Sequence, residues 1–395
     1  MNFLVAYSGG LDSHVLLHLI SQLPDYHVRA MHVHHGLQEE ANYWVYHCQN
    51  ICNDLDVSLE VKYLSLNIGR GESLEDVARK GRYLALKQAL KADEILITAH
   101  HQNDQAETLL LQLFRGAGIQ GLASMPEVND IGLNKHARPL LSQSRAELEM
   151  YAEDFNLDFI EDPSNKDTRF DRNFLRQKLF PTLRGRWKGI DKTLSRAARI
   201  QGETKKILDE LAEQDLQLCD PDRNNTLSIK VLLQLSYPRQ KLLIRYWIMK
   251  SGFSHPSEKK LEHIFSDVIN ARKEAQPLVK WKGIELRRFK NQLYIMPTLS
   301  EHDTKQSFDW NVAAPLEIKS LGLTLKPSIL KLDDPVVTVR FRQGGERIFI
   351  PERGVTVSLK NLFNEREVPP WLRSRTPLIY VNDVLKEILI KSNYF

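Results

Sequence analysis

A short apolar strand, a glycine-rich turn and a helix start together constrain this chain most. Residues 3–7 read Phe-Leu-Val-Ala-Tyr, and residues 8–13 read Ser-Gly-Gly-Leu-Asp-Ser before an apolar, helix-like run. Gly9 and Gly10 let the backbone curl without Cβ clashes. The turn then presents N–H groups to an anion, with the positive end of a helix dipole behind them. The pattern predicts a phosphate-binding loop, and the alternative is a helix N-cap with turn glycines.

The side chains of this loop also suit a phosphate. Ser8 and Ser13 add hydroxyl donors on either side of Leu11. Asp12 is a carboxylate beside a phosphate site, which fits a Mg²⁺ ligand or a group that orients the nucleotide. The spacing matches neither Gly-x-x-x-x-Gly-Lys-Ser/Thr nor Gly-x-Gly-x-x-Gly. It resembles the PP-loop of the N-type ATP pyrophosphatases, which split ATP between the α and β phosphates and adenylate a carbonyl oxygen.

Length and cysteine content set the broad class of protein. A chain of 395 residues is too long for one ordinary domain. No apolar run approaches the length of a membrane span, so we expect no membrane partner. Three cysteines cannot form a disulfide framework, which predicts a cytoplasmic protein.

The first part of the chain alternates apolar strands with helical patterns. Strands are predicted near residues 2–8, 27–34, 57–66, 94–99 and 157–161. Helices are predicted near residues 12–22, 39–55, 73–91, 103–115 and 144–156. This α/β alternation predicts a doubly wound, Rossmann-like parallel sheet over residues 1–190. Ligands of such sheets bind at the carboxyl ends of the strands, where the Ser8–Ser13 turn, residues 32–36 and residues 99–104 would meet.

The remainder of the chain is predicted to form two further domains. Residues 191–299 are mainly helical, with apolar residues at three- and four-residue spacing and a strand-rich end at 278–296. The largely polar stretch between Pro297 and Pro315 is predicted to be a linker. Short β-branched runs and turn signals over residues 316–395 predict a small α+β domain.

A second chemical cluster follows the strand predicted at 94–99. Asp104 and Glu107 are three residues apart at a helix start, so both carboxylates lie on one helical face. They would seat a cation, either Mg²⁺ or an ammonium group; the alternative is two acids favoured by the helix dipole. His100 and His101 could suggest zinc with the histidines at 32, 34 and 35, but no cysteine and no helical His-x-x-x-His pair accompanies them.

Positive charge is concentrated in one stretch. Between Asn165 and Lys206 there are thirteen Lys and Arg residues against four acids, whereas the whole chain carries a net charge of +4. Such a stretch is a candidate footprint for a nucleic acid, and the alternative is a solvated helix face.

Further motifs recur in one order in one family. They are residues 32–37, 76–79 with 82–83, 100–108, 115–122, 138–141, 161–165, 172–176, 340–347, 359–363 and 368–371. With them the chain resembles the tRNA(Ile)-lysidine synthetases over nearly its whole length, most densely in residues 3–181 and 340–382. One departure is Asn103, which stands where the family commonly has the first acid of His-His-x-Asp-Asp.

The resemblance implies a two-step ligation on tRNA. ATP adenylates the C2 carbonyl oxygen of the wobble cytidine (position 34) of the CAU-anticodon tRNA(Ile), and free L-lysine then displaces AMP to give lysidine. The implied small molecules are therefore ATP, Mg²⁺ and lysine. The basic stretch and the C-terminal arginines (Arg340, Arg342, Arg347, Arg353, Arg373 and Arg375) would grip the tRNA. The oligomeric state is left open, a homodimer included.

The resemblance also implies roles for single residues. The loop residues Ser8, Gly9, Gly10, Leu11 and Ser13 would hold the pyrophosphate portion of ATP, and Asp12 would help to hold Mg²⁺. Asp104 and Glu107 would bind the amino groups of lysine. Arg176 and Arg79 are assigned to the ATP or intermediate site, with structural salt bridges as the alternative. His32 would contact the nucleotide, with a hydrogen-bonded core histidine as the alternative.

Two functions of other classes compete with this interpretation. A PP-loop tRNA thiolase would need a reactive cysteine near the nucleotide, whereas Cys48 and Cys52 fall within a predicted helix and Cys219 in the helical region. A non-catalytic, nucleotide-gated RNA-binding module would not need Asp12, Asp104, Glu107 and Arg176.

Overall fold

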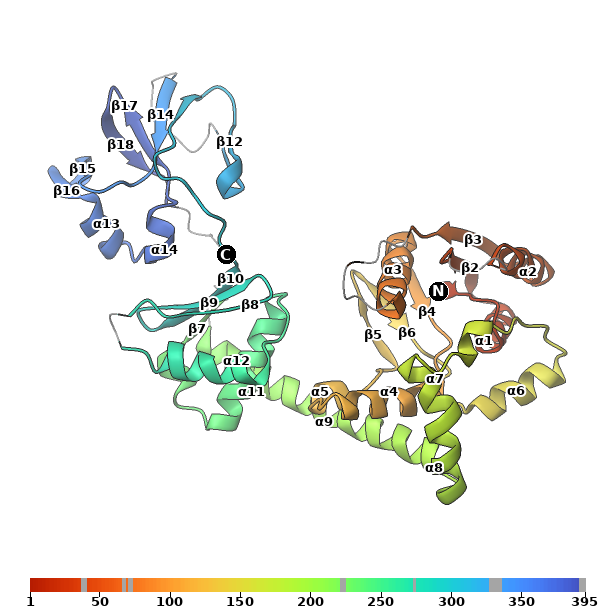
Figure 1. The fold of residues 1–395 in the computed structure, drawn as a ribbon. Helices are drawn as coiled ribbons and strands as arrows, with labels where there is room; N and C mark the ends of the chain where they lie inside the picture. The colour runs from red at the N-terminus through yellow and green to blue at the C-terminus, as the bar shows by residue number, and fades with distance from the viewer. Residues whose placement is uncertain are drawn as a thin grey trace. The chain divides into compact units, whose positions relative to one another are not determined.

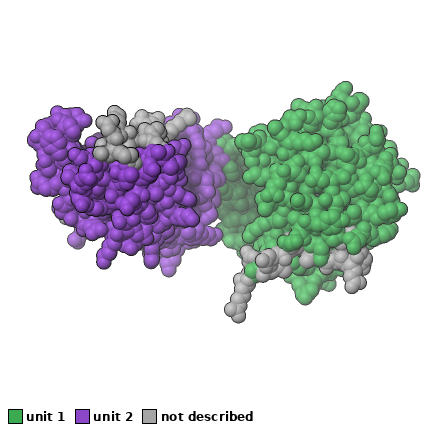
Figure 2. Space-filling model, turned by 90° about the horizontal axis from the view of Figure 1, so that it is seen from above, with its two compact units in different colours: residues 1–207 green, residues 208–395 purple. Residues whose placement is uncertain are grey.

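The computed structural model describes residues 1–36, 41–65, 69, 74–220, 225–272, 275–326 and 336–390. The chain divides into two compact units, residues 1–207 and residues 208–395 (Figure 2). Within the described residues, no helix is long and apolar enough to cross a membrane.

A six-stranded, mainly parallel sheet is the centre of the first unit (Figure 1). In spatial order its strands are β3 (Ser58–Tyr63), β2 (His27–His34), β1 (Asn2–Ala6), β4 (Glu94–Ile97), β6 (Asn134–Ala137) and β5 (Val128–Ile131). Only β5 runs antiparallel to its neighbour, β6. Because β1 pairs with both β2 and β4 in parallel register, the carboxyl ends of these three strands meet at one edge.

Helices cover both faces of this sheet, as the strand pattern predicts. Leu4 packs with α3 (Leu74–Ala89) on one face. The next residue, Val5, packs on the other face with α1 (Leu11–Ser21), α2 (Ala41–Asp54) and α6 (Arg145–Asp154). Successive strand residues point to opposite faces, so strands that are apolar throughout can be buried on both sides. The predicted doubly wound α/β architecture is confirmed.

Two details of the predicted sheet are wrong. Residues 157–161 form no strand; the segment is extended, and its Ile160 N–H donates to the Gly9 carbonyl at 2.9 Å. The hairpin of β5 and β6 takes the next position beside β4, although Asn134–Ala137 is too polar to read as a strand.

A broken helical run follows the sheet. It comprises η1 (Pro163–Lys166), α7 (Asp171–Phe174), the π-helical turn η2 (Leu175–Leu179), α8 (Phe180–Arg186) and α9 (Ile190–Cys219). Pro181 lacks an N–H group, so it cannot bond the carbonyl four residues earlier, and the wide π turn lies directly before it. Leu175 and Phe180 pack against Ala106 and Leu110 of α4 (Gln102–Phe114), which fixes this run on the helix that carries Asp104 and Glu107. The short helix α5 (Ile119–Leu122) follows α4.

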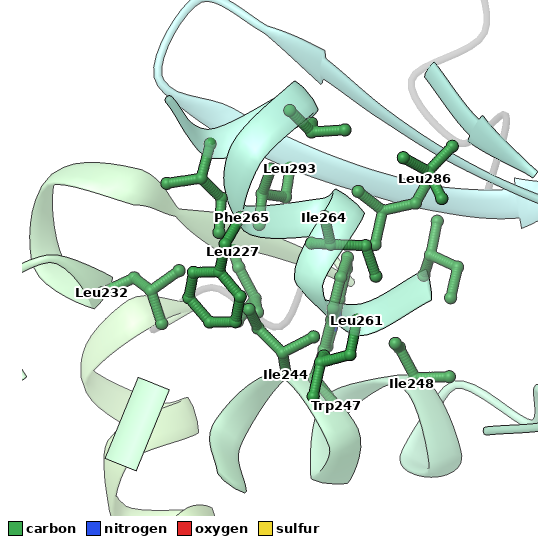
Figure 3. Packing of buried hydrophobic residues seen from close by; sticks show 14 of the residues in the cluster. Leu227, Leu232, Ile244, Trp247, Ile248, Leu261, Ile264, Phe265, Leu286 and Leu293 are labelled. Carbon is green, nitrogen blue, oxygen red and sulfur yellow. The ribbon is translucent and has the colours of Figure 1, made fainter. Parts of the chain in front are cut away.

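The second unit begins with helices packed on an antiparallel sheet. The sheet order is β7 (Thr226–Ser228), β10 (Gln292–Pro297), β9 (Ile284–Phe289) and β8 (Leu278–Trp281). The helices are α10 (Ile229–Leu232), α11 (Tyr237–Lys250), α12 (Glu258–His263) and the π turn η3 (Ile264–Ile269). Figure 3 shows their common core, in which Trp247 of α11 lies among aliphatic side chains.

The other face of the same sheet is also covered. Leu293 and Ile295 belong to the helical core, whereas Tyr294 and Met296 pack with Trp371 and other residues of the C-terminal part. The ring centroids of Tyr294 and Trp371 are 5.4 Å apart, edge to face. The middle and C-terminal parts therefore share a hydrophobic core.

The C-terminal part is the predicted small α+β fold. Its main sheet has the order β11 (Phe308–Asn311), β14 (Val336–Arg340), β17 (Leu378–Val381) and β18 (Val384–Ile388). Two hairpins accompany it, β12 (Leu316–Ile318) with β13 (Leu323–Leu325) and β15 (Arg347–Ile350) with β16 (Val355–Ser358). The helices are α13 (Leu359–Glu365) and α14 (Pro370–Arg373), and single 3-10 turns lie at Lys319–Leu321 and Pro351–Arg353. Because β11 lies within 297–315, that stretch is not a mere linker, and the sheet begins before residue 316.

Trp247→Ala should destabilise the second unit by about 3–5 kcal/mol, because it removes a large, fully buried side chain from the core between the helices and the β7–β10–β9–β8 sheet. Urea unfolding of the variant should show a transition shifted to lower denaturant. The matched control is Trp187→Ala, since Trp187 is 56% exposed and should leave the transition in place. Equal midpoints for the two variants would contradict this account of the core.

Candidate active site

The Ser8–Ser13 loop joins β1 to α1 at the carboxyl edge of the sheet. The Ser13 hydroxyl donates to the Gly10 carbonyl at 2.9 Å and lies 3.0 Å from the Ser8 hydroxyl. Gly10 is the N-cap and makes no side-chain cap, and Leu11 starts α1 with its side chain in the apolar core. The loop thus offers backbone N–H groups and two hydroxyls at a helix N-terminus, which is the arrangement that receives a phosphate.

Gly9 is required by both conformation and packing. Its φ of +83° is in the left-handed region that favours glycine. A Cβ at this position would lie 2.8 Å from Ile160 Cδ1 and 2.9 Å from Cys48 Sγ. The extended segment after α6 therefore closes directly over the loop, and no larger residue fits there.

Asp12 lies beside the loop and is paired with an arginine that the sequence did not single out. Arg145 Nη1 donates to both carboxylate oxygens, at 2.7 and 2.8 Å. His101 Nε2 lies 3.6 Å from Asp12 Oδ2 and 3.5 Å from Asp104 Oδ2. The histidine thus lies between the carboxylate of the loop and the first acid of α4.

Asp104 and Glu107 share the cation Arg176. Its Nη2 donates to Asp104 Oδ1 at 2.7 Å, and its Nε donates to Glu107 Oε1 at 2.6 Å. Arg172 Nε lies 3.6 Å from Glu107 Oε2. That Oε2 is buried and, among the described residues, accepts no hydrogen bond. Asp12, Asp104, Glu107 and Arg176, chosen from distant parts of the sequence, therefore form one cluster with His101.

Burial and pairing shift the pKa values of this cluster in different directions. Burial raises the pKa of Glu107, and Arg176 does not fully offset it. Burial also opposes ionisation of Asp104, but His101 and Arg176 outweigh it and hold its pKa below the usual range. For His101 burial lowers the pKa, yet the hydrogen bond to Asp12 and the charge of Asp104 leave it raised. The site therefore holds an ionised Asp104 beside a carboxyl that ionises less readily.

Two predicted residues lie apart from this cluster. Arg79 is on α3, with its guanidinium 5.4 Å from the centre of the Tyr83 ring. His32, near the end of β2, is buried, and its Nδ1 donates to the Tyr7 carbonyl at 3.1 Å. Their roles at a nucleotide stay predictions, and for His32 the hydrogen bond provides the partner that a core histidine would need.

Comparisons with known proteins identify the family of this chain. Residues 1–183 match the family model of the PP-loop domain, residues 227–294 the TilS substrate binding domain, and residues 337–389 the TilS substrate C-terminal domain. The tRNA(Ile)-lysidine synthase of Coxiella burnetii is 44% identical over 397 residues, covering 97% of this chain and 87% of the relative. Relatives of the same name from Methylococcus capsulatus (38% identity, 96% and 89% coverage) and Legionella pneumophila (37%, 97% and 89%) also match. The chain belongs to the tRNA(Ile)-lysidine synthase family.

A solved structure of the U34-tRNA thiolase NcsA from Methanococcus maripaludis overlaps part of the chain. It has 16% sequence identity and a TM-score of 0.45, and it covers 51% of this chain and 73% of the thiolase.

The residues of this family member fit a Mg²⁺ ion that is shared between the protein and substrate phosphates. Within the described residues, no three His, Cys, Asp or Glu side chains gather as a metal-ligand group, zinc included. Mg²⁺ is usually bound by one or two carboxylates together with substrate phosphates. Asp12, with a side chain 29% exposed beside the phosphate loop, is suited to that shared form of binding.

Asn103 has a structural role at this site. Its Nδ2 donates to Asp191 of α9 at 3.0 Å, and its Oδ1 accepts from the Arg145 N–H at 3.0 Å. An aspartate could not donate to Asp191, whereas the amide both donates and accepts. Asn103 therefore fixes the start of α6, and with it Arg145.

Sequence reasoning missed Arg145 and the contacts of His101. The Ser144–Glu147 capping box does mark the start of α6 in the sequence. The pairing of Arg145 with Asp12 spans 133 residues, so no local pattern could reveal it.

Arg176→Gln should destabilise the first unit by about 1–3 kcal/mol, because two buried carboxylates lose the charged donor that they share. Thermal and urea unfolding would measure the loss. The double variant Arg176→Gln, Glu107→Gln should recover part of it by removing one of the unpaired charges. If the double variant is as unstable as the sum of the single variants, the two side chains are not coupled as the distances indicate.

Proposed function

We propose that this chain ligates lysine to C2 of the wobble cytidine of the CAU-anticodon tRNA(Ile), using ATP and giving lysidine. The modification changes the codon and amino-acid specificity of the tRNA from Met to Ile. One observation carries the proposal: in a chain of this family, a phosphate loop lies beside buried acids of which one oxygen is left without a hydrogen bond.

The reaction has two balanced steps. The C2 carbonyl oxygen of cytidine attacks the α-phosphorus of ATP, and the bond to pyrophosphate breaks. The ε-ammonium of lysine then releases one proton, the resulting amine attacks C2, the bond from C2 to the adenylate oxygen breaks, and AMP leaves with that oxygen. The cytidine must be unstacked from the anticodon loop to be reached, which is the usual way in which enzymes reach a base.

In the first step the PP-loop would hold the departing pyrophosphate. The N–H groups at Gly9, Gly10 and Leu11 and the hydroxyls of Ser8 and Ser13 are donors suited to charge that develops on phosphate oxygens. Asp12 would be the protein ligand of Mg²⁺, which when bound would neutralise phosphate charge. Arg79 and His32 complete the proposed nucleotide contacts.

In the second step Glu107 and Asp104 would receive the amino groups of lysine. The Oε2 atom of Glu107 is an unused acceptor, since it accepts no hydrogen bond among the described residues and its nearest cation, Arg172 Nε, lies 3.6 Å away. Both oxygens of Asp104 already accept hydrogen bonds, one from the Arg176 guanidinium and one from the backbone N–H of His101. We therefore assign the closer ammonium contact to Glu107 and a supporting electrostatic role to Asp104.

The thiolase alternative lacks a suitable nucleophile. Cys48, Cys52 and Cys219 are all buried and free. Burial raises the pKa of Cys48 and Cys52 to about 12 and that of Cys219 to about 11. A thiolate is the reactive form, so none of these cysteines is suited to sulfur transfer near neutral pH. Free thiols also fit the cytoplasmic location that the sequence predicts.

The direct test is mass spectrometry of tRNA. Unmodified CAU-anticodon tRNA(Ile) is incubated with the full chain, ATP, Mg²⁺ and lysine, then digested to nucleosides. The expected product is one cytidine that carries the added mass of lysine, less one water. The matched control is the elongator tRNA(Met), which shares the CAU anticodon and should stay unmodified. Absence of the lysine adduct from tRNA(Ile) would overturn the proposal.

Glu107→Gln should raise the KM for lysine by about tenfold or more while changing the KM for ATP little, because it removes the charge that faces the ammonium. Asp104→Asn should have a smaller effect of the same kind. Glu153→Gln on the exposed face of α6 is the matched control and should be neutral. An increase confined to the KM for ATP would instead assign the pair to the nucleotide.

The tRNA would contact the basic stretch at 165–206, but several of its charges are already paired. Arg169, Arg184 and Arg199 form ion pairs with Asp167, Asp191 and Glu203. Arg186 and Lys188 have no ion-pair partner within the described residues, and they flank the exposed Trp187 at the end of α8. Cations beside an exposed aromatic ring suit the phosphates and unstacked bases of a single-stranded loop.

The C-terminal arginines are also partly engaged. Arg340 and Arg353 pair with Asp383 and Glu365, and Arg375 donates to the Ser300 carbonyl. Cutting the chain near Leu299 would also expose Met296 and Tyr294 of the shared core, so point substitutions test tRNA binding better than truncation.

Arg186→Gln with Lys188→Gln should weaken tRNA binding and make its salt dependence shallower. The log–log slope should fall by about 0.7–0.9 for each phosphate that the protein no longer neutralises. Filter binding at several salt concentrations measures both quantities. The charge-matched control is Arg169→Gln with Arg199→Gln, which removes two cations that already have partners. If both double variants change affinity and slope equally, the tRNA does not use the surface around Trp187.

A further inference from the structure

Four polar side chains form a continuous hydrogen-bonded chain at the ends of β4 and β6. Arg138 Nη2 lies 3.2 Å from His136 Nδ1, and His136 Nε2 lies 2.9 Å from the Thr98 hydroxyl. The same hydroxyl lies 2.7 Å from His100 Nδ1. Thr98, His136 and Arg138 are each less than a tenth exposed, so water does not compete for these bonds.

Arg138 sets the donor and acceptor roles along this row of hydrogen bonds. A guanidinium can only donate, so His136 Nδ1 must accept and the proton of this neutral ring is on Nε2. That N–H donates to the Thr98 oxygen. The Thr98 hydroxyl has no other acceptor among the described residues, so its single proton goes to His100 Nδ1. His100 is therefore neutral, with its own proton on Nε2. Burial lowers the pKa of His136 to about 4 and that of His100 to about 3, which agrees with two neutral rings.

His100 lies beside the candidate active site. It follows β4, which pairs with β1, the strand that leads into the phosphate loop. The charged groups that face it are Asp104 of α4, Arg82 of α3, Arg172 of α7 and Arg138. Its side chain is partly exposed, and among the described residues its Nε2 makes no hydrogen bond. A directed, neutral N–H donor is thus left for a ligand.

We propose that Arg138, His136 and Thr98 are positioning residues that hold His100 as a neutral donor, whose Nε2–H bonds an anionic oxygen of a substrate. That oxygen belongs to the α-phosphate of ATP or to the carboxylate of lysine, and the inference rests on the proposed function. A neutral imidazole can stabilise developing negative charge without giving up its proton. No bond is made or broken by His100, and its proton stays on Nε2 throughout.

The first test reads the tautomer and needs no activity. In the full chain labelled with nitrogen-15 histidine, the His100 ring signals are assigned by their loss in His100→Gln. They should show the neutral Nε2–H form between about pH 6 and pH 8, where an ordinary histidine titrates. Thr98→Val should mix the two tautomers, and Thr98→Ser should restore the single form. A protonated ring or an Nδ1–H tautomer in the unchanged protein would overturn the proposal.

The second test reads the reaction. Thr98→Val should slow it by about tenfold or more, Thr98→Ser should keep most of the rate, and melting temperatures show that both fold. Thr376→Val is the matched control, because Thr376 is buried like Thr98 and its hydroxyl donates to the Leu372 carbonyl, outside the candidate active site. His100→Gln should retain more activity than His100→Ala, because the amide still offers an N–H. Equal rates for Thr98→Val and Thr98→Ser would refute the proposal that Thr98 positions His100.

Two arms identify the oxygen. ATP–pyrophosphate exchange on tRNA without lysine isolates adenylation, and a fall there in Thr98→Val assigns the donor to the α-phosphate. Unchanged exchange, with a slower transfer of lysine but not of cadaverine, assigns it to the carboxylate that cadaverine lacks. If the unchanged protein forms no lysidine at all, the proposed function fails. The tautomer of His100 measured in the first test would still show whether Arg138, His136 and Thr98 position that ring.

Discussion

The sharing of Arg176 by Asp104 and Glu107 is the interaction on which the candidate active site depends. Two carboxylates buried a helical turn apart repel each other and lose their hydration, so they need a cation that reaches both. Arg176 reaches them from the π-helical turn η2, where Pro181 interrupts the regular helix. The same contact holds the η2–α8 run against α4, together with the apolar packing of Leu175 and Phe180. The Arg176 guanidinium therefore both holds two elements of the first unit together and balances the charge of the candidate active site.

The sheet explains why such costly polar groups gather where they do. Helices cover both faces of β1, β2 and β4, so the interior of each strand must be apolar. Polar side chains are tolerated where the strands end and the covering helices begin. The phosphate loop follows β1, His32 lies near the end of β2, and His100 follows β4. Motifs almost a hundred residues apart thus converge because only one edge of the sheet can hold them.

The local sequence pattern predicted most strands of the first sheet and the strands β8 to β10 correctly. The runs that became β1, β4 and β10 are largely apolar, whereas β2, β8 and β9 mix apolar with polar residues. The pairing of all six strands in the structure confirms them. The segment 157–161 has the same character but is not a strand, because the Asp158 carbonyl accepts from His14 and the Ile160 N–H donates to Gly9. Conversely, Asn134–Ala137 lacks that pattern and becomes β6 through its pairing with β4 and β5. Competition among partners, which no local window contains, decided both cases.

The same limit applies to the site. The residue types and spacing of Asp12, Asp104 and Glu107 were readable as chemistry, but the cations that pair with them were not. Asn103 illustrates the reason: from sequence it was a missing carboxylate, whereas in the structure it bonds both Asp191 and the N–H of Arg145. By fixing the first turn of α6 it holds Arg145 against Asp12. An aspartate at position 103 would repel Asp191 and could not replace this bridge, so the departure from the family pattern fits the contacts of this particular chain.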